Sequence, residues 1–208
     1  MAIKAIIFDM DGVLIDAREW HYESLNKALG LFGAEISRYD HLVTFDGLPT
    51  KKKLEMLSLE GGFPVKLHQF VNDLKQQYTL EIIYAKCKPV FQHQFALSKL
   101  KSEGYKLAVC SNSVRKTVEI MMEKSGLSPY LEFYLSNQDV TKGKPDPEMY
   151  INAINKLGLK PEECLIVEDN ENGVKAALAS GAQLLKVEHT GDVHYYNIKR
   201  RINEVENA

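Results

Sequence analysis

The chain has 208 residues, of which 45% are hydrophobic and 26% are charged, and its formal net charge is -2. This composition is typical of a globular protein with one substantial core and room for a smaller second domain. Basic and acidic residues are mixed along the chain, without the basic footprint that binds nucleic acid or the polybasic patch that binds a membrane. We therefore expect a small-molecule partner, no nucleic-acid or membrane partner, and a monomer.

The cysteines and the apolar runs indicate the cellular compartment in which the protein is expected. The three cysteines, Cys87, Cys110 and Cys164, make an odd count, and the last two lie in apolar runs where buried thiols are common. No apolar stretch approaches the roughly 18 residues of a membrane-spanning helix, and charged residues come too early for a signal peptide. These features predict a cytoplasmic protein.

The first predicted strand, Ile3–Asp9, is an apolar run that ends in a carboxylate, with Asp11 and Gly12 close behind. An apolar run bounded by turn residues is typical of a strand buried on both faces. In open parallel sheets the ligand crevice lies beyond the carboxyl ends of such strands. The chemistry is therefore expected to begin at Asp9.

Residues from about 15 to 87 carry helical periodicity. Phe32 falls on the apolar face of the first predicted helix, and Thr50 is expected to cap the second. Pro64 is expected to begin a third helix, with Phe70 on its inward face. This stretch is predicted to be entirely helical.

After Pro89, strands and helices alternate almost to the end. Further strands are expected at Tyr105–Cys110, Leu131–Leu135, Cys164–Val167 and Gln183–Val187. Ser113 is expected to cap the helix after the second strand. Asp146 as cap and Pro147 as first helical residue are expected to begin the helix after the third strand.

This alternation predicts an α/β fold, because strands joined by helices of ten to fifteen residues form right-handed parallel crossovers. We expect a doubly wound, Rossmann-like parallel sheet with an inserted all-helical cap domain. The core domain would comprise residues 1–14 and 88–208, and the cap residues 15–87. An insertion directly after the first strand would hang over the site, as a lid does.

Polar side chains follow several strands of the predicted sheet: Asp9 and Asp11, Ser111, Lys144 in the loop before a helix, and the pair Glu168 and Asp169. Each has an ordinary explanation, since a lysine beside a proline is usually solvated and an acidic pair before a helix can cap it. Together they are harder to explain as accidents. Closely placed carboxylates repel one another unless a cation or a proton lies between them.

The residue types suit phosphoryl transfer. Asp9, Glu168 and Asp169 offer the hard oxygens that Mg²⁺ prefers. Lys144 and Ser111 complement an anion. A carboxylate such as Asp9 can attack phosphorus as a nucleophile, while Asp11 protonates the leaving oxygen and later deprotonates water. Mg²⁺ would lower the repulsion between carboxylate and phosphate.

Four ordered stretches resemble the motifs of the haloacid dehalogenase superfamily: Asp9-Met-Asp11-Gly-Val, Ser111-Asn112-Ser113, Gly143-Lys144-Pro145-Asp146-Pro147 and Val167-Glu168-Asp169-Asn170-Glu-Asn-Gly173. The resemblance covers essentially the whole chain and is greatest to β-phosphoglucomutase-like phosphatases. It implies that Asp9 is the nucleophile and that Asp11 is the acid/base and a Mg²⁺ ligand through its backbone carbonyl.

The same resemblance implies roles for the later motifs. Ser111, Asn112 and Lys144 would hold the phosphoryl group. Asp169 would be a metal ligand, and Glu168 a ligand or its immediate support. The dehalogenase and phosphonatase branches of the superfamily lack an acid where Asp11 stands, so cleavage of carbon–halogen or carbon–phosphorus bonds is not expected.

The cap residues separate phosphatase from phosphomutase. The mutases that this chain resembles carry an Asp-Thr or Asp-Ser pair before the cap histidine, where this sequence has Ala17 before His21. They also carry an arginine where Thr50 stands, with Lys51 one place later. Because arginine binds phosphate bidentately and lysine only as a point charge, a second phosphate should be held less firmly. These changes favour hydrolysis.

His21, Lys51 and Lys75 are the candidate cap residues for the substrate. The mutase counterpart of His21 contacts the acid/base Asp, although a partly buried helix histidine is an alternative. For Lys75 the favoured interpretation is an ordinary solvated helix lysine.

The sequence therefore predicts a Mg²⁺-dependent phosphatase of a small phosphorylated metabolite such as a sugar phosphate, acting through an aspartyl-phosphate. A β-phosphoglucomutase-like mutase is the alternative. A receiver-like or non-catalytic phospho-binding protein is more distant, because a receiver domain needs neither Asp11 nor a helical cap.

Overall fold

The core of the protein is a five-stranded parallel sheet with the strand order β3-β2-β1-β4-β5. This computed structural model describes residues 2–45 and 47–207, so the outermost residues of the predicted core domain, 1 and 208, lie outside the described part. The strands are β1 (Ala5–Phe8), β2 (Lys106–Cys110), β3 (Phe133–Leu135), β4 (Cys164–Glu168) and β5 (Gln183–Lys186).

β1 is the central strand, and its four residues are fully buried. It pairs with β2 on one side and with β4 on the other, so Phe8 stands opposite both Val109 and Val167. Burial on both faces explains why the strand is an uninterrupted apolar run. The register brings the carboxyl ends of β1, β2 and β4 to one edge of the sheet.

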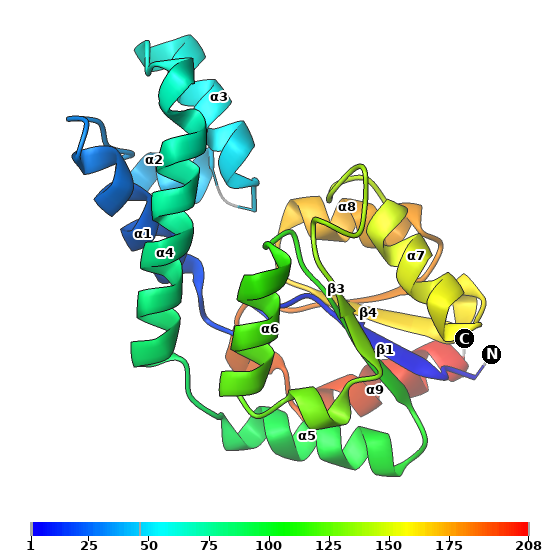
Figure 1. Ribbon diagram of the computed structural model, residues 1–208. Helices are drawn as coiled ribbons and strands as arrows, with labels where there is room; N and C mark the ends of the chain where they lie inside the picture. Colours follow the sequence, from blue (N-terminus) through cyan, green and yellow to red (C-terminus); the bar gives the residue numbers. More distant parts are fainter. Residues whose placement is uncertain (1, 46, 208) are drawn as a thin grey trace. The chain divides into compact units, whose positions relative to one another are not determined.

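Helices cover both faces of the sheet (Figure 1). On one face lie α5 (Phe91–Ser102), α6 (Arg115–Lys124) and α9 (Tyr195–Glu206), and on the other lie α7 (Glu148–Leu157) and α8 (Glu171–Ala179). Single turns of 3-10 helix occur at Ser128–Tyr130, Pro161–Glu163 and Thr190–Asp192. The predicted doubly wound α/β fold is therefore confirmed.

The side chains under α7 and α8 form one apolar cluster. Ile7 and Ile166 from the sheet pack there with Met149, Ala153 and Ala177 from the two helices. Fully burying a side chain of this size stabilises the fold by about 1.5–3 kcal/mol. The sheet is thus anchored directly behind the strand ends that carry the polar residues.

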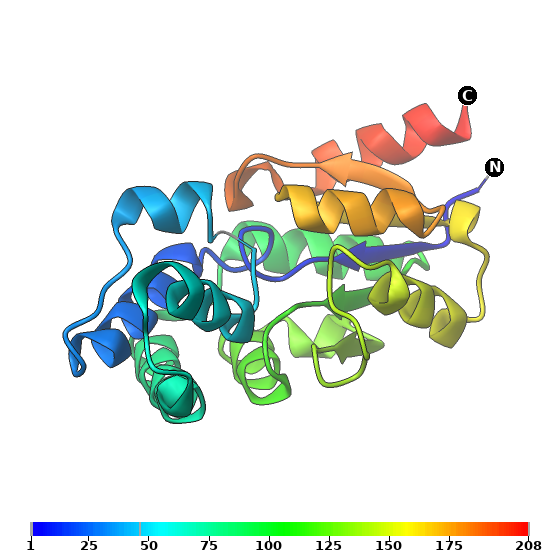
Figure 2. The ribbon, with the colours of Figure 1, turned by 90° about the horizontal axis from the view of Figure 1, so that it is seen from above.

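The two ends of the core lie side by side (Figures 1 and 2). The backbone N–H of Ile3, just before β1, donates to Glu206 Oε1 at the end of α9 over 2.9 Å. This bond links the central strand to the last helix.

The contacts divide the chain into two compact units, Met1–Asp16 with Lys88–Ala208, and Ala17–Cys87. The second unit is helical: α1 (Arg18–Gly30), α2 (Arg38–Val43), α3 (Thr50–Gly61), a 3-10 turn Val65–Leu67 and α4 (His68–Lys86). It has its own apolar cluster, built around Leu29, Leu54 and Val71. The roles of the two units as catalytic core and cap remain a prediction.

Several local predictions in the helical unit were wrong. Phe32 and Phe70 are 39% and 54% exposed rather than inward. Phe32 lies beyond the end of α1, so the helical spacing no longer applies to it, and the two rings pack edge to face with centroids 6.0 Å apart. Thr50 is the first residue of α3 and Pro49 takes the cap position. Pro64 is followed by a 3-10 turn, so α4 begins only at His68.

The start of α7 also differs from the prediction by one residue. Pro147 occupies the cap position and the helix begins at Glu148. Asp146 still caps the helix in effect, since its Oδ1 accepts the Glu148 N–H over 3.0 Å. A proline has no N–H to offer, so the carboxylate binds the next available donor.

Candidate active site

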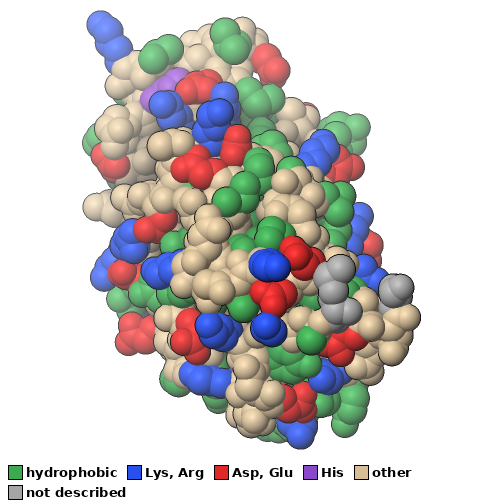
Figure 3. Space-filling view, turned by 90° about the vertical axis from the view of Figure 1, so that its right-hand side faces the viewer, with side chains coloured by type: hydrophobic (Ala, Val, Ile, Leu, Met, Phe, Trp, Pro, Cys, Tyr) green, Lys and Arg blue, Asp and Glu red, His purple; other side chains and the backbone are tan. Residues whose placement is uncertain are grey.

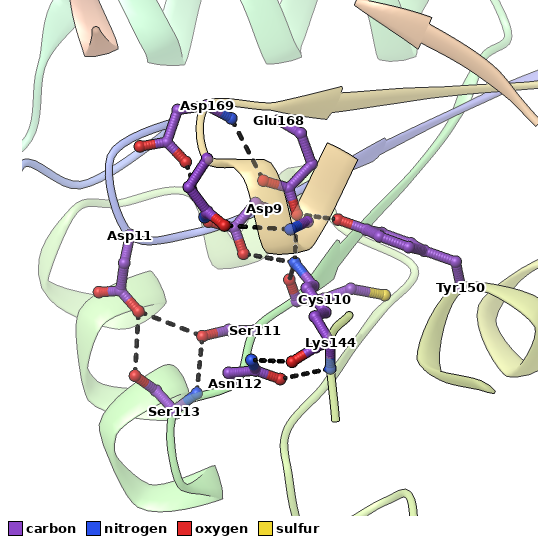
Figure 4. Close-up of polar contacts among 12 residues, drawn as sticks. Asp9, Asp11, Cys110, Ser111, Asn112, Ser113, Lys144, Tyr150, Glu168 and Asp169 are labelled. Atoms are coloured by element: carbon purple, nitrogen blue, oxygen red, sulfur yellow. Dashed lines mark hydrogen bonds and ion pairs between the residues drawn. The ribbon is translucent and has the colours of Figure 1, made fainter. Parts of the chain in front are cut away.

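A buried ammonium group joins two carboxylates at the carboxyl edge of the sheet (Figure 4). Lys144 Nζ donates to Asp9 Oδ1 over 2.6 Å and to Glu168 Oε1 over 2.7 Å, and to the carbonyl oxygen of Cys110 over 2.9 Å. Asp9 follows β1 and Glu168 ends β4. Lys144 is only 4% exposed, so its interpretation as a solvated surface lysine is wrong.

Burial and neighbouring charges perturb these groups. Desolvation raises the pKa of Asp9 well above its ordinary value, and the negative charges of nearby carboxylates add to this while Lys144 opposes it. Desolvation alone would lower the pKa of Lys144, but the attraction of Asp9 and Glu168 is stronger in sum and raises it. Lys144 is therefore a fixed positive charge, whereas burial and the neighbouring carboxylates disfavour the charged form of Asp9.

Asn112 fixes the backbone of Lys144. Its side-chain Oδ1 accepts the Lys144 N–H over 3.0 Å, and its Nδ2 donates to the Lys144 carbonyl over 3.1 Å. This two-point contact ties the loop after β2 to the loop before α7. Asn112 thus positions the lysine through its side chain, which the sequence did not predict.

The carboxylate of Asp11 is held by two hydroxyl groups. Ser113 Oγ donates to Asp11 Oδ2 over 2.9 Å, and Ser111 Oγ donates to the same oxygen over 3.2 Å. Ser111 is completely buried and also accepts the Ser113 N–H over 3.0 Å. The prediction that Ser113 caps α6 was wrong, because Val114 takes the cap position and the serine side chain contacts Asp11 instead.

Asp169 lies against the turn that follows β1. Gly12 has a φ of +89°, and a Cβ there would lie 2.0 Å from Asp169 Oδ2. A glycine is therefore required both by the left-handed backbone and by the close approach of the carboxylate. Asn170, rather than the acidic pair, caps α8 by accepting the Gly173 N–H over 3.0 Å, so Glu168 and Asp169 are not capping residues.

Three of the carboxylates form a candidate metal site. One oxygen from each of Asp9, Glu168 and Asp169 lies within 4.8 Å of the others. All three donors are hard carboxylate oxygens, and the group contains no soft sulfur or imidazole ligand. This donor set fits Mg²⁺ better than zinc or copper.

Tyr150 is a neighbour of the cluster that the sequence did not reveal. It is fully buried in α7, and its hydroxyl donates to Glu168 Oε1 over 2.5 Å. The signal was present, because a tyrosine on the buried face of a helix needs a hydrogen-bond partner for its hydroxyl. Which partner it finds depends on the tertiary fold.

The thiol of Cys110 beside this cluster is not a nucleophile. Burial, the largest effect, raises its pKa to about 12, so the reactive thiolate is not formed at neutral pH. All three cysteines are free and buried.

The predicted cap residues lie in the helical unit. Lys75 is 7% exposed, and its Nζ lies 3.2 Å from Nδ1 of His21. Its interpretation as a solvated helix lysine is therefore wrong. The structure brings His21 and Lys75 together across α1 and α4, whereas Lys51 is exposed on α3.

The surface carries both signs of charge. On the face that Figure 3 shows, Lys and Arg side chains are interspersed with Asp and Glu side chains. Across residues 2–45 and 47–207, no helix has the length and apolarity needed to cross a membrane.

The sequence profile of one family, described as haloacid dehalogenase-like hydrolase, matches residues 6–187 of this chain. The chain belongs to this family. The match includes Asp9, Ser111, Lys144 and Glu168, so the resemblance predicted from the four motifs is confirmed.

Two relatives of this chain, referred to below as the hydrolase, are named as phosphatases. It is 28% identical over 198 residues to a phosphorylated carbohydrates phosphatase of Thermotoga maritima, which covers 94% of this chain and 88% of that protein. It is 29% identical over 197 residues to the pyrophosphatase PpaX of Bacillus velezensis, over 90% of this chain and 84% of the relative.

The fold of the hydrolase is that of a known mutase structure. A β-phosphoglucomutase from Clostridium difficile superposes with a TM-score of 0.85 at 21% identity, over 99% of this chain and 100% of that one. At this identity the likeness concerns the fold alone. Membership of the hydrolase family makes the chain an enzyme of the phosphatase and phosphomutase type.

Proposed function

We propose that this enzyme is a Mg²⁺-dependent phosphatase that hydrolyses a small phosphomonoester through an aspartyl-phosphate at Asp9. The observation that carries the proposal is the buried contact of Lys144 with Asp9 and Glu168, beside the Asp11 carboxylate that two hydroxyls hold. A nucleophile, an anion-binding cation and an acid/base therefore meet at one edge of the sheet.

In the first step, Asp9 attacks phosphorus. Its carboxylate forms the new P–O bond, while Lys144 donates a hydrogen bond to Oδ1. As the bond to the leaving alcohol breaks, the carboxylic acid of Asp11 gives its proton to the departing oxygen. Lys144 and Ser111 stabilise the negative charge on the phosphoryl oxygens.

In the second step, water hydrolyses the aspartyl-phosphate. The Asp11 carboxylate accepts a proton from the water, whose oxygen attacks phosphorus and releases inorganic phosphate and the Asp9 carboxylate. The Ser113 hydroxyl orients Asp11 for both steps.

Asp9, Asp11 through its carbonyl, Glu168 and Asp169 are the residues that would hold Mg²⁺. When bound, the ion offsets the repulsion between the acidic cluster and the phosphate. The closeness of the Asp9, Glu168 and Asp169 oxygens supports this assignment.

The proposed substrate class is a sugar phosphate. The name of the Thermotoga maritima relative supports it. His21, Lys51 and Lys75 are proposed to contact the polar end of the substrate. The replacements at Ala17 and Thr50 favour hydrolysis over a mutase reaction, which needs a grip on a second phosphate.

The test is phosphate release from a panel of sugar phosphates, phosphoglycolate and pyrophosphate, with and without EDTA. We expect release from at least one monoester, abolished by EDTA and restored by added Mg²⁺. Activity that persists without metal would contradict the proposal. A mutase would instead convert β-glucose 1-phosphate, with the 1,6-bisphosphate present, to glucose 6-phosphate without net phosphate release.

A further inference from the structure

Tyr150 is a polar residue inside an otherwise apolar cluster. It belongs to the core group that includes Met149, Ala153 and Ile154, and it is fully buried. Its hydroxyl nevertheless has a partner, since it donates to Glu168 Oε1 over 2.5 Å. If the ring were needed only for packing, phenylalanine would serve at a lower free-energy cost, because a buried hydroxyl must find a hydrogen-bond partner.

The Tyr150–Glu168 hydrogen bond helps to determine which donors each oxygen of the Glu168 carboxylate accepts. Oε1 accepts two donors, the Tyr150 hydroxyl and Lys144 Nζ, and Oε2 accepts the Asp169 N–H over 3.2 Å. A carboxylate oxygen has about two acceptor sites, so Oε1 is fully used and Oε2 is the oxygen left with capacity for a cation. Gly173 also lies against this carboxylate, since a Cβ there would come within 1.9 Å of it.

Lys144 is fixed by the same arrangement. Its ammonium has three protons and three acceptors, namely Asp9, Glu168 and the Cys110 carbonyl. The Tyr150 ring also lies 4.7 Å from Nζ, within the range of a cation–π contact. Tyr150 therefore acts on Lys144 directly through its ring and indirectly through Glu168.

We propose that Tyr150 is a positioning residue for the phosphoryl pocket: its hydroxyl holds Glu168 in the orientation that fixes the Lys144 ammonium beside Asp9. The inference rests on the proposed function, in which the fixed positive charge of Lys144 attracts the phosphoryl group. It adds a residue outside the four motifs, contributed by the helix that follows Lys144.

The direct test is binding of inorganic phosphate to the Mg²⁺-loaded protein, measured by calorimetry for the wild type, Tyr150→Phe and Tyr195→Phe. Tyr195 is the matched control, because its hydroxyl also donates to a glutamate, Glu103 Oε1, over 2.5 Å, but on the exposed surface. We expect phosphate to bind about tenfold more weakly to Tyr150→Phe, as for a lost hydrogen bond to a charged group, and unchanged to Tyr195→Phe.

A double-mutant cycle distinguishes positioning from a general loss of packing. If Tyr150 acts through Glu168, Tyr150→Phe should change phosphate binding by less than about twofold when Glu168→Gln is already present. An equal loss in both backgrounds, or wild-type phosphate binding by a folded Tyr150→Phe, would overturn the inference.

A second measurement covers the case in which Tyr150→Phe does not fold. In a crystal structure of the wild type with Mg²⁺ and phosphate, Tyr150 and Lys144 should still share Glu168 Oε1, and a Lys144 ammonium that has left Glu168 would overturn the inference. Failure of the proposed function is distinguishable from failure of this inference. In that case no monoester in the panel is hydrolysed, whereas the phosphate-binding cycle still shows whether Tyr150 acts through Glu168. Wild-type protein that binds no phosphate would overturn both.

Discussion

Ser113 shows how a side chain before a helix can bind a distant carboxylate rather than cap the helix. Its hydroxyl donates to Asp11 Oδ2, although its position before α6 suits a capping residue. Ser113→Ala should lower kcat by about fivefold, equivalent to about 1 kcal/mol for one lost hydrogen bond. KM should change little, because the substitution affects the orientation of the proposed acid/base group, Asp11, and not the binding of the phosphoryl group.

The control for this prediction is Ser113→Thr, which keeps the hydroxyl and should retain most of the activity. Ser102→Ala removes a hydroxyl that donates only to the Lys99 carbonyl and should leave the rate unchanged. If Ser113→Ala and Ser113→Thr lost the same activity, the orienting role of the hydroxyl would be refuted.

At the scale of elements, α8 approaches β4 closely through Gly173. In an ordinary helix interior, alanine is more stable than glycine by about 0.5–1 kcal/mol. Here a Cβ would overlap the Glu168 carboxylate, at 1.9 Å. Gly173→Ala should therefore destabilise the protein by about 1–3 kcal/mol, as overpacking does, and abolish most of the activity.

Urea unfolding and a phosphatase assay check this prediction. Gly61→Ala is the matched control, since it also lies in a helix, α3, and nothing lies within 4 Å of the added Cβ. It should be neutral or slightly stabilising. A Gly173→Ala protein as stable and active as Gly61→Ala would show that the fit of α8 on Glu168 is not tight.

The elements also show what the sequence could predict. Parallel strands end at one edge of a sheet, so Asp9, Ser111 and Glu168 could be placed together from strand ends alone. The partners of Ser113 and Tyr150 could not, because each hydroxyl binds a carboxylate of another element, 102 and 18 residues away in the sequence. Local capping rules and helical periodicity describe one segment at a time, which is why Ser113 and Phe70 were assigned wrongly.

At the scale of the whole molecule, the buried acidic cluster couples stability to pH. Burial raises the pKa of Asp9 above its ordinary 3.8. Because the folded protein holds this proton more tightly than the unfolded chain does, the raised pKa stabilises the fold fully at a pH below the unfolded-state pKa. This stabilisation is lost as the pH rises through the folded-state pKa. The metal-free protein should lose stability over this range, and Asp9→Asn should flatten the profile. Unfolding of both proteins in EDTA across pH checks this, and parallel profiles would contradict it.

Metal binding should restore this stability. A ligand that binds only the folded state at 100 times its dissociation constant adds about 2.7 kcal/mol. We expect a gain of this order for the wild type with Mg²⁺, and a much smaller gain for Asp169→Asn, which lacks one of the clustered carboxylates. Thermal unfolding with and without Mg²⁺ measures both, and equal gains would exclude Asp169 as a ligand.

The proposed mechanism requires that Asp9 becomes phosphorylated during turnover. The most direct measurement is mass spectrometry of the enzyme, quenched in acid during turnover of a monoester that the panel identifies and then digested. We expect one added phosphoryl group on the peptide that contains Asp9, dependent on Mg²⁺ and absent in Asp9→Asn, which should also be inactive. Turnover with no phosphate on that peptide, or full activity of Asp9→Asn, would contradict it.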